Sequence, residues 1–573
     1  MANFYSDIQE IKFELENSPL MHRIVELKEL NFADKDVHNY APQDFADAMD
    51  SYDRLLDIVG DIMGNVVAPN AESVDAEGAH HENGRVRYAS KTYENLQAVN
   101  QAGLNGMTMP RRYGGLNLPV TVYTAANEMV ARADAGFQNI WSLQDCIETL
   151  YCFGTEEQRK KYIPRVCAGE TMSMDLTEPD AGSDLQSVML KATYDEENNC
   201  WRLNGSKRFI TNGDSDIHLV LARSEAGTRD GRGLSMFIYD KRDGGVDVRR
   251  IENKMGIHGS PTCELVYKNA KCELCGDRKM GLIKYVMSLM NGARLGIAAQ
   301  SVGLSQAAYE EAIAYARDRR QFGKAIIEFP AVAEMISNIK ARLDAGRALL
   351  YQTARYVDIY KNLEDISRER KLTPEERQEL KLYSRLADAF TPLAKGMNSE
   401  YANQNAYDSI QVHGGSGFML EYACQRIYRD ARIASIYEGT TQLQTVAAIR
   451  YVTNGMYATV IQEMEQQAMM AGLEGDSTLR RLKEMASKFN ACTAAVKDSG
   501  DQDFHDLCAR HLYDMVGSII MCHLLLQNAL KAPELFGRSL QVYANIADAE
   551  VEKQFNWIRK MTPEKVEFYR QAL

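Results

Sequence analysis

The sequence predicts a mostly helical α+β protein in which one β domain separates two helical stretches. Apolar residues recur at three- and four-residue intervals from Phe4 to about Ile163 and again from Met280 onward, which is the spacing of helices. Between about Met172 and Cys272 the period shortens and Gly, Asn and Asp interrupt it, as is typical of strands and turns. The 573 residues, 45% hydrophobic and 25% charged, are sufficient for several domains with buried cores.

The first helical stretch contains one clear apolar stripe. The residues that define it are Leu55, Ile58, Val59, Ile62 and Met63, whose spacing places them on one face of a helix. Two segments rich in Gly, Pro and polar residues are expected to be loops, residues 69–84 and 110–115.

The β domain should contain several short strands. A hairpin is expected around an Asn204-Gly205 turn, with Trp201–Leu203 and Lys207–Thr211 as its strands. Further strands are expected at His218–Ala222, Leu234–Tyr239 and Glu264–Tyr267.

The second helical stretch begins with a periodic face formed by Val332, Met335, Ile336, Ile339 and Leu343, which suggests a helix bundle. The charged segment Leu363–Gln378, which contains Pro374, is expected to be a solvated loop between helices. Beyond Asn454 we expect a further helical unit, with helices around Leu479–Phe489, Phe504–Leu530 and Ala544–Trp557. The predicted parts are 1–48, 49–171, 172–280, 281–453 and 454–573.

Charge and composition exclude some classes of function. The 79 Asp and Glu against 66 Lys and Arg argue against general binding of nucleic acid, which requires clustered positive charge. The start of the chain lacks a basic region followed by an apolar stretch, and the longest apolar run, Ile519–Leu526, is too short to span a bilayer. Eleven scattered cysteines fit reduced thiols better than a disulfide framework. We expect a cytoplasmic protein without membrane contact.

Common nucleotide-binding, metal-binding and catalytic motifs are absent or incomplete in this sequence. No G-x-G-x-x-G follows a strand and no P-loop occurs, so a Rossmann or P-loop enzyme is not indicated. Cys272 and Cys275 could be half of a zinc site or a redox pair, but no second pair follows, and no metal is expected. His258 and His413 could be general bases; by residue type alone, histidines that cap loops are the better interpretation.

Several motifs, separated along the chain, together resemble those of one known protein family. The motifs are Leu176–Asp184 (LTEPDAGSD), Arg208–Gly213 (RFITNG), Lys254–Leu265, Asp318–Lys324 (DRRQFGK), Gln411–Phe418 and Ile436–Gln442 (IYEGTTQ). In this order they resemble the acyl-CoA dehydrogenase family of flavoproteins, over roughly residues 50–450. The added C-terminal unit and His258 resemble the longer branch that includes 3-methylmercaptopropionyl-CoA dehydrogenases.

The resemblance implies a fold and a reaction. The fold would be an N-terminal helical domain, a middle β-barrel, a C-terminal four-helix bundle and a C-terminal helical extension. The reaction would be the FAD-dependent conversion of an acyl-CoA thioester into a trans-2-enoyl-CoA, as in β-oxidation of fatty acids. Electrons would pass to an electron-transfer flavoprotein, and the enzyme would be a homodimer or homotetramer.

The catalytic base implied by the resemblance is Glu438. By residue type alone it could be an ordinary surface carboxylate near a helix end, and only the surrounding motif favours the base. Gly439 would let the chain turn close to the ligand. Some family members carry the base just before an arginine that matches Arg294, but here that position is Ala293, which takes no proton.

The resemblance also implies binding residues. For FAD they are Leu176, Thr177, Ser183, Phe209, Thr211, Arg319, Gln321, Phe322, Gln411, Gly415, Thr440 and Gln442. Of these, Arg319, Gln321 and Phe322 match residues that reach the FAD of a neighbouring subunit. For the acyl-CoA they are Ser183, Arg294, Tyr437 and Gly439. Phe209 stands where a Trp is common, and Asn291 where an acid is common.

The acyl group and the electron acceptor are less constrained. A helix around Gln138–Leu150 would floor the acyl pocket, and the bulk of Ile140, Trp141 and Leu143 favours short to medium chains. One alternative is an acyl-CoA oxidase or another flavin enzyme of the same fold. Another is a nucleic-acid-associated member, but residues 454–573 carry 13 Lys and Arg against 16 Asp and Glu, which fits stabilisation of an oligomer better.

Overall fold

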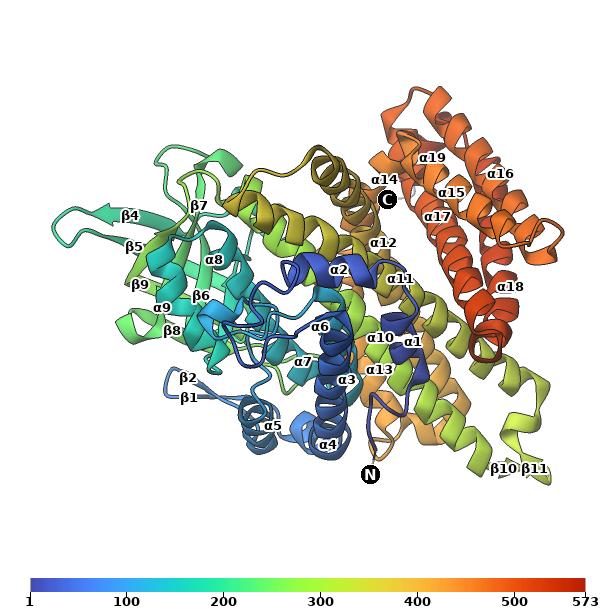
Figure 1. The fold of residues 1–573 in the computed structure, drawn as a ribbon, viewed down its shortest axis with the longest axis horizontal. Coiled ribbons are helices and arrows are strands. Elements are labelled where there is room, and N and C mark those ends of the chain that lie inside the picture. The colour runs from blue at the N-terminus through green and yellow to red at the C-terminus, as the bar shows by residue number, and fades with distance from the viewer. Residues whose placement is uncertain (1, 572–573) are drawn as a thin grey trace. The chain divides into compact units, whose positions relative to one another are not determined.

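The computed structural model describes residues 2–571. Two units emerge from its internal packing, one made of Met1–Leu15 and Pro19–Gly303, the other of Glu16–Ser18 and Leu304–Leu573. Within residues 2–571, no helix combines the length and the apolar character that crossing a membrane requires. Figure 1 labels the elements.

The first unit begins with helices. They are α1 (Gln9–Glu16), α2 (Met21–Lys28), α3 (Phe45–Ile62), α4 (Ala68–Glu77), α5 (Ser90–Gln101), α6 (Val120–Ala133), α7 (Ala135–Trp141), α8 (Ile147–Phe153), α9 (Glu156–Cys167) and the first half of α10 (Met287–Asp318). The apolar stripe predicted for α3 was placed slightly wrong. Ile58 is 50% exposed, whereas the buried stripe runs through Tyr52, Leu56, Val59 and Met63.

The loop predicted for residues 69–84 was also wrong. Most of it is α4, in whose first turn Pro69 lies, where a missing N–H costs little. The rest forms a hairpin of β1 (His80–Glu82) and β2 (Arg85–Arg87). Asn83 and Gly84 have φ of 51° and 75°, so this Asn-Gly pair makes the tight turn.

The middle of the chain is a closed sheet. Its strands are β3 (Met172–Asp175), β4 (Lys191–Asp195), β5 (Cys200–Thr211), β6 (Ile217–Arg223), β7 (Leu234–Asp240), β8 (Val246–Ile251) and β9 (Thr262–Cys275). The pairings run β6, β4, β5, β9, β7 and back to β6, with β3 on β6 and β8 on β9. The predicted middle β-barrel is therefore confirmed.

The hairpin predicted at Asn204-Gly205 does not exist. Both residues lie inside β5, which runs unbroken for 12 residues. Gly205 has a φ of 139° and marks a bulge between Leu203 and Gly205 in the pairing with β9. The dipeptide bends a long barrel strand here instead of reversing the chain.

The second unit is helical apart from one hairpin. It contains the end of α10, β10 (Arg320–Gln321), β11 (Lys324–Ala325), α11 (Pro330–Glu369), α12 (Pro374–His413), α13 (Ala423–Ala431), α14 (Thr441–Thr453), α15 (Met456–Met470), α16 (Ser477–Asp498), α17 (Gln502–Lys531), α18 (Pro533–Ile558) and α19 (Glu564–Gln571). Ala312, Ala316, Ile336, Ile339 and Val412 share one apolar cluster, which joins α10, α11 and α12. This confirms the predicted helix bundle.

The loop predicted for Leu363–Gln378 is much shorter in the structure. Only residues 370–373 separate α11 from α12. Thr373 caps α12 reciprocally with Glu376, and Pro374 takes the first turn, so the charged residues around them are helical.

The C-terminal helices pack against one another and against the bundle. Helices α15 to α18 lie side by side (Figure 1), and α17 and α18 both contact α11. Ile519, Ile520, Leu524 and Leu525 on α17 are 0–4% exposed. The apolar run that the sequence places here is therefore buried.

Candidate active site

The predicted site residues fall into both units. The first unit holds Leu176, Thr177, Ser183, Phe209, Thr211 and Arg294, and the second unit holds the others.

In the barrel, the end of β3 lies beside β5. The backbone N–H of Arg208 donates to the carbonyl of Thr177 at 2.9 Å, so the predicted flavin residues of the two segments are neighbours. Lys207, which is 0% exposed, donates from Nζ to the Leu176 carbonyl at 2.8 Å and to Glu178 Oε1 at 2.9 Å.

Glu178 completes this buried ion pair. Its carboxylate accepts the backbone N–H groups of Met189 at 2.7 Å and Leu190 at 2.9 Å. Burial lowers the pKa of Lys207, and the opposing effect of Glu178 keeps the charged pair together. Lys207 and Glu178 thereby fix the backbone of Leu176 and Thr177. Neither was predicted to have this role, although a lysine in an otherwise apolar strand position is a usable signal.

Phe209 sits on strained backbone. Its φ is 60°, uncommon for an aromatic residue, and it falls in a bulge between Lys207 and Ile210 of β5. The side chain is 52% exposed, and the guanidinium carbon of Arg208 lies 4.6 Å from the ring centroid. The bulge therefore presents an aromatic ring at the barrel surface next to the partly exposed Thr211.

The two predicted acyl-CoA residues of this unit differ in setting. Ser183 is exposed in the turn that follows the paired Glu178 and Ala181. Arg294 is partly buried on α10, and its Nη1 donates to Asn291 Oδ1 at 3.2 Å. The Asn that replaces the family's acid therefore orients this arginine with a neutral hydrogen bond.

The single helix predicted for Gln138–Leu150 was wrong. The segment consists of α7, a 3₁₀ turn at Ser142–Cys146, and α8. Ile140, Trp141 and Leu143 are 2–8% exposed, and Trp141 Nε1 donates to the Leu104 carbonyl at 2.9 Å. These bulky residues are part of the core of their own unit.

In the second unit, Glu438 lies in a tight loop. The loop follows a 3₁₀ turn at Arg432–Ser435 and precedes α14, whose N-cap Thr440 accepts the Leu443 N–H at 3.3 Å. Glu438 and Gly439 have φ of 55° and 88°. A glutamate in the left-handed region is uncommon, and such conformations cluster at functional sites because the surroundings must hold them.

Two buried side chains hold this loop. Lys395 Nζ donates to the Gly439 carbonyl at 2.7 Å, and Gln444 Nε2 donates to the same carbonyl at 2.9 Å and to that of Glu438 at 3.3 Å. Both side chains are 0% exposed. No sequence motif predicts these two residues, although a lysine within the apolar run of α12 is a signal that points to Lys395.

A second group of predicted residues lies where α10 and α12 end. The Tyr315 ring stacks on His413 at 4.3 Å, and its hydroxyl donates to Ser416 Oγ at 3.2 Å. These contacts bring Gln411 and Gly415 close to Arg319, which begins the β10–β11 hairpin. A Cβ on Gly414 or Gly415 would meet nothing, and Phe322 at the hairpin tip is 94% exposed with a φ of 49°.

The two groups of the second unit are far apart. Lys395, beneath the Glu438 loop, and Gln411 lie on one helix 16 residues apart, which corresponds to about 24 Å. The structure therefore groups Tyr437, Glu438, Gly439, Thr440 and Gln442, and separately Arg319, Gln321, Phe322, Gln411 and Gly415.

The histidines and cysteines singled out in the sequence have structural roles. His413 Nδ1 contacts the Ser409 carbonyl at 2.7 Å, and burial lowers its pKa. His258 bridges Asp75 Oδ1 at 3.0 Å and the Lys254 carbonyl at 2.8 Å. Cys272 and Cys275 belong to different apolar clusters. Within residues 2–571, no group of three or more His, Cys, Asp and Glu is placed to hold a metal ion.

Comparison with family models covers most of the chain. Successive matches are "Acyl-CoA dehydrogenase, N-terminal domain" at 50–170, "middle domain" at 173–270, "C-terminal domain" at 283–453 and "Acyl-CoA dehydrogenase C terminal" at 453–566. The chain belongs to the acyl-CoA dehydrogenase family. The resemblance seen in the motifs is thus confirmed. As a member of this family, the chain is an enzyme.

Individual relatives agree. The 3-methylmercaptopropionyl-CoA dehydrogenase of Ruegeria pomeroyi is 32% identical over 77% of this chain and 79% of its own length. Butyryl-CoA dehydrogenase from Megasphaera elsdenii is 29% identical, with a TM-score of 0.59 over 69% of this chain and 96% of that one. An acyl-CoA dehydrogenase from Bacillus anthracis, solved with FAD, is 24% identical with a TM-score of 0.74 over 93% of this chain and 91% of that one, and shows that the longer fold is shared.

Proposed function

We propose that this chain is an FAD-dependent enzyme that converts a short- to medium-chain acyl-CoA thioester into its trans-2-enoyl-CoA, with Glu438 as the base. The observation that carries the proposal is the Glu438 loop. Glu438 occupies the position that the family motif assigns to the base. Its φ is 55°, and two fully buried side chains hold the backbone of its loop by hydrogen bonds.

The residues present fit FAD. Phe209 offers an exposed aromatic face, and its neighbour Arg208 bonds through the backbone to Thr177, in the segment that Lys207 holds at the Leu176 carbonyl. At the end of α12, Gly414 and Gly415 leave open space where a bulky group could approach the backbone. FAD supplies the acceptor for the hydrogen that leaves the β-carbon as a hydride.

Glu438 would accept the proton from the α-carbon of the thioester on one of its carboxylate oxygens. The α-hydrogen of a thioester is a weak acid, so the base must be held close and shielded from water to act efficiently. Lys395 and Gln444 fix the Glu438 and Gly439 carbonyls, which leaves the side-chain torsions as the main freedom of this carboxylate.

Four predicted residues would contact the acyl-CoA. We propose that Arg294, oriented by Asn291, supplies positive charge for the CoA, and that Ser183 contacts the CoA or the FAD pyrophosphate. Tyr437 and Gly439 would border the acyl group next to the base.

The separation of the two site groups along α12 supports a shared cofactor. Because Gln411 lies about 24 Å along the helix from the turn beneath Glu438, one compact site cannot use both groups. We propose that Arg319, Gln321, Phe322, Gln411 and Gly415 bind the FAD of a neighbouring subunit in a homodimer or homotetramer, and that an electron-transfer flavoprotein accepts the electrons.

Reduction of the flavin by thioesters tests this function. The purified protein should contain about one FAD per chain, and its absorbance should bleach anaerobically with saturated acyl-CoA thioesters of short to medium length. Slow reoxidation in air would support an electron-transfer flavoprotein as acceptor, whereas fast reoxidation would favour the oxidase. A protein that takes up no FAD, or whose flavin no thioester bleaches, would refute the proposal.

A further inference from the structure

Helix α17 of the C-terminal extension, residues 454–573, inserts a tyrosine into the backbone of α12. Tyr513 is 0% exposed; its hydroxyl donates to the Pro392 carbonyl at 2.8 Å and lies 3.5 Å from the Leu393 carbonyl. Pro392 has no N–H to donate to the preceding turn of α12, but its carbonyl remains an acceptor, and it is this carbonyl that the Tyr513 hydroxyl engages. A side-chain hydroxyl from the extension thus takes part in the hydrogen bonding of this turn.

Gly396 makes this insertion possible. A Cβ at Gly396 would lie 2.0 Å from the hydroxyl oxygen of Tyr513, so any larger residue would push the tyrosine out. The close approach of α17 to α12 is therefore specific to this turn.

The turn that receives Tyr513 also carries Lys395. Lys395 lies between Pro392 and Met397, and its Nζ donates to the Gly439 carbonyl at 2.7 Å, one residue after Glu438. A buried ammonium group must keep its partners, because an unsatisfied buried charge is very costly. A shift of this turn would therefore be transmitted to the loop through Lys395.

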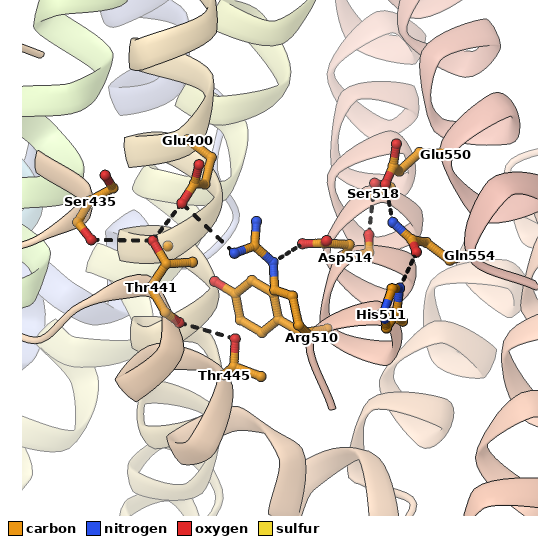
Figure 2. A network of polar contacts seen from close by, with 12 residues as sticks. Glu400, Ser435, Thr441, Thr445, Arg510, His511, Asp514, Ser518, Glu550 and Gln554 are labelled. Carbon is orange, nitrogen blue, oxygen red and sulfur yellow. Dashed lines mark hydrogen bonds and ion pairs between the residues drawn. The ribbon is translucent and has the colours of Figure 1, made fainter. Parts of the chain in front are cut away.

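The extension has a second, weaker contact with the loop (Figure 2). Thr441 Oγ1 lies 2.6 Å from Glu400 Oε1 and 3.4 Å from the Ser435 carbonyl, so it ties the two ends of the loop together. Arg510 of α17 places Nη1 3.8 Å from the same Glu400 oxygen, and its Nε donates to Asp514 Oδ1 at 2.8 Å. Arg510 and Glu400 are partly exposed, and ion pairs in such settings contribute little.

We propose that Tyr513 is a positioning residue for the catalytic base, so that the C-terminal extension supports the active site. It acts through the Pro392–Met397 turn and Lys395 on the backbone of Glu438, and Arg510 adds a smaller contribution through Glu400 and Thr441. This inference rests on the proposed function, because it takes Glu438 as the base.

The test compares two tyrosines in the full-length, FAD-loaded protein. Tyr513→Phe removes the hydroxyl that enters α12. Tyr543→Phe is the matched control, because Tyr543 is also 0% exposed and also links the extension to α12, but only through the Tyr401 hydroxyl at 2.8 Å. Anaerobic flavin reduction by a thioester is followed over pH, together with thioester affinity, FAD content and Tm.

Tyr513→Phe should slow flavin reduction by about tenfold and change its pH profile, with FAD content and thioester affinity nearly unchanged. Tyr543→Phe should leave the rate within about twofold even if its Tm falls equally. Lys395→Met should slow reduction at least as much, and adding Tyr513→Phe to it should slow it no further, because both act along one path. Arg510→Met should slow reduction by about twofold, with recovery in Arg510→Lys.

Three results would overturn the inference: a wild-type rate in Tyr513→Phe, a loss no larger than that of Tyr543→Phe, or multiplicative effects of Lys395→Met and Tyr513→Phe. If Tyr513→Phe lost FAD, its rate could not be compared with that of the wild type, and the test would rest on Arg510→Met and Arg510→Lys. Wild-type rates in both of these variants would refute the proposed support of the Glu438 loop by the extension. Glu438→Gln separates the two proposals. A wild-type rate there would refute the function itself, whereas an inactive Glu438→Gln with a normal Tyr513→Phe would refute only this inference.

Discussion

Two groups of predicted site residues, one in each unit, are both held by a buried lysine, but the two lysines have different support. In the barrel, the fully buried Lys207 donates to the Leu176 carbonyl, and in the bundle the fully buried Lys395 donates to the Gly439 carbonyl. Lys207 is held within its own domain by Glu178, whereas Lys395 lies on a helical turn that α17 of the extension completes. The barrel side should therefore be stable by itself, and the Glu438 loop should depend on the extension.

Loss of the buried ion pair in the barrel should reduce the stability of the protein most. Lys207→Met leaves Glu178 buried without its cation, which should destabilise the protein by about 3–5 kcal/mol and release FAD. Thermal unfolding and FAD absorbance measure both effects. The double variant Lys207→Met with Glu178→Gln should recover part of the loss, because it removes the uncompensated charge. An unchanged Tm in Lys207→Met would show that this ion pair does not hold the Leu176 segment.

Phe322 belongs to the second group of predicted residues in the bundle, and its substitution should affect FAD binding but not stability. Phe322 is 94% exposed and makes no core contact to lose, so Phe322→Ser should leave the Tm of the FAD-free protein unchanged within experimental error. If its ring contacts the FAD of a neighbouring subunit, FAD content should fall several-fold and the oligomer should weaken. FAD titration and light scattering test this prediction. A fully loaded, normally assembled Phe322→Ser protein would contradict the shared site.

A third prediction concerns the pH dependence of the stability of the extension. Burial lowers the pKa of His523 to about 4 from its ordinary 6.5, and its Nε2 has no hydrogen-bond partner within residues 2–571. Between these pH values the unfolded chain binds a proton that the folded chain does not. Stability should therefore fall as pH drops from about 6.5 to 4, by up to ~3 kcal/mol.

His523→Leu should abolish this part of the acid loss, as unfolding of the variant at several pH values would show. Equal slopes for His523→Leu and the wild type would mean that His523 does not contribute.

The sequence predicted the order of domains well because that order depends on periodicity and motifs, which are local signals. It failed where the same local signal has two meanings. Of two Asn-Gly pairs, Asn83-Gly84 makes a hairpin turn and Asn204-Gly205 bends a continuous strand. Only the long-range pairing of β5 with β9 distinguishes them, and no short segment contains that information.

The same limit of local signals applies to the candidate site. The motifs predict Glu438 and the residues that would contact FAD. They do not predict Lys395 or Tyr513, whose contacts join residues 44 and 121 positions apart, nor Gln444, whose contacts with the Glu438 and Gly439 carbonyls span only six and five residues. A buried lysine in an apolar run signals that it has a partner, but the partner becomes known only when the chain is folded.

Glu438→Gln is the decisive test of the proposed catalytic base. The substitution is nearly isosteric and leaves the Glu438 and Gly439 carbonyls with their Lys395 and Gln444 donors, so the variant should fold and retain FAD. Stopped-flow mixing with an acyl-CoA thioester under anaerobic conditions should show flavin reduction slowed by about 10²-fold or more. Reduction at the wild-type rate would contradict the account, because the base would then lie elsewhere.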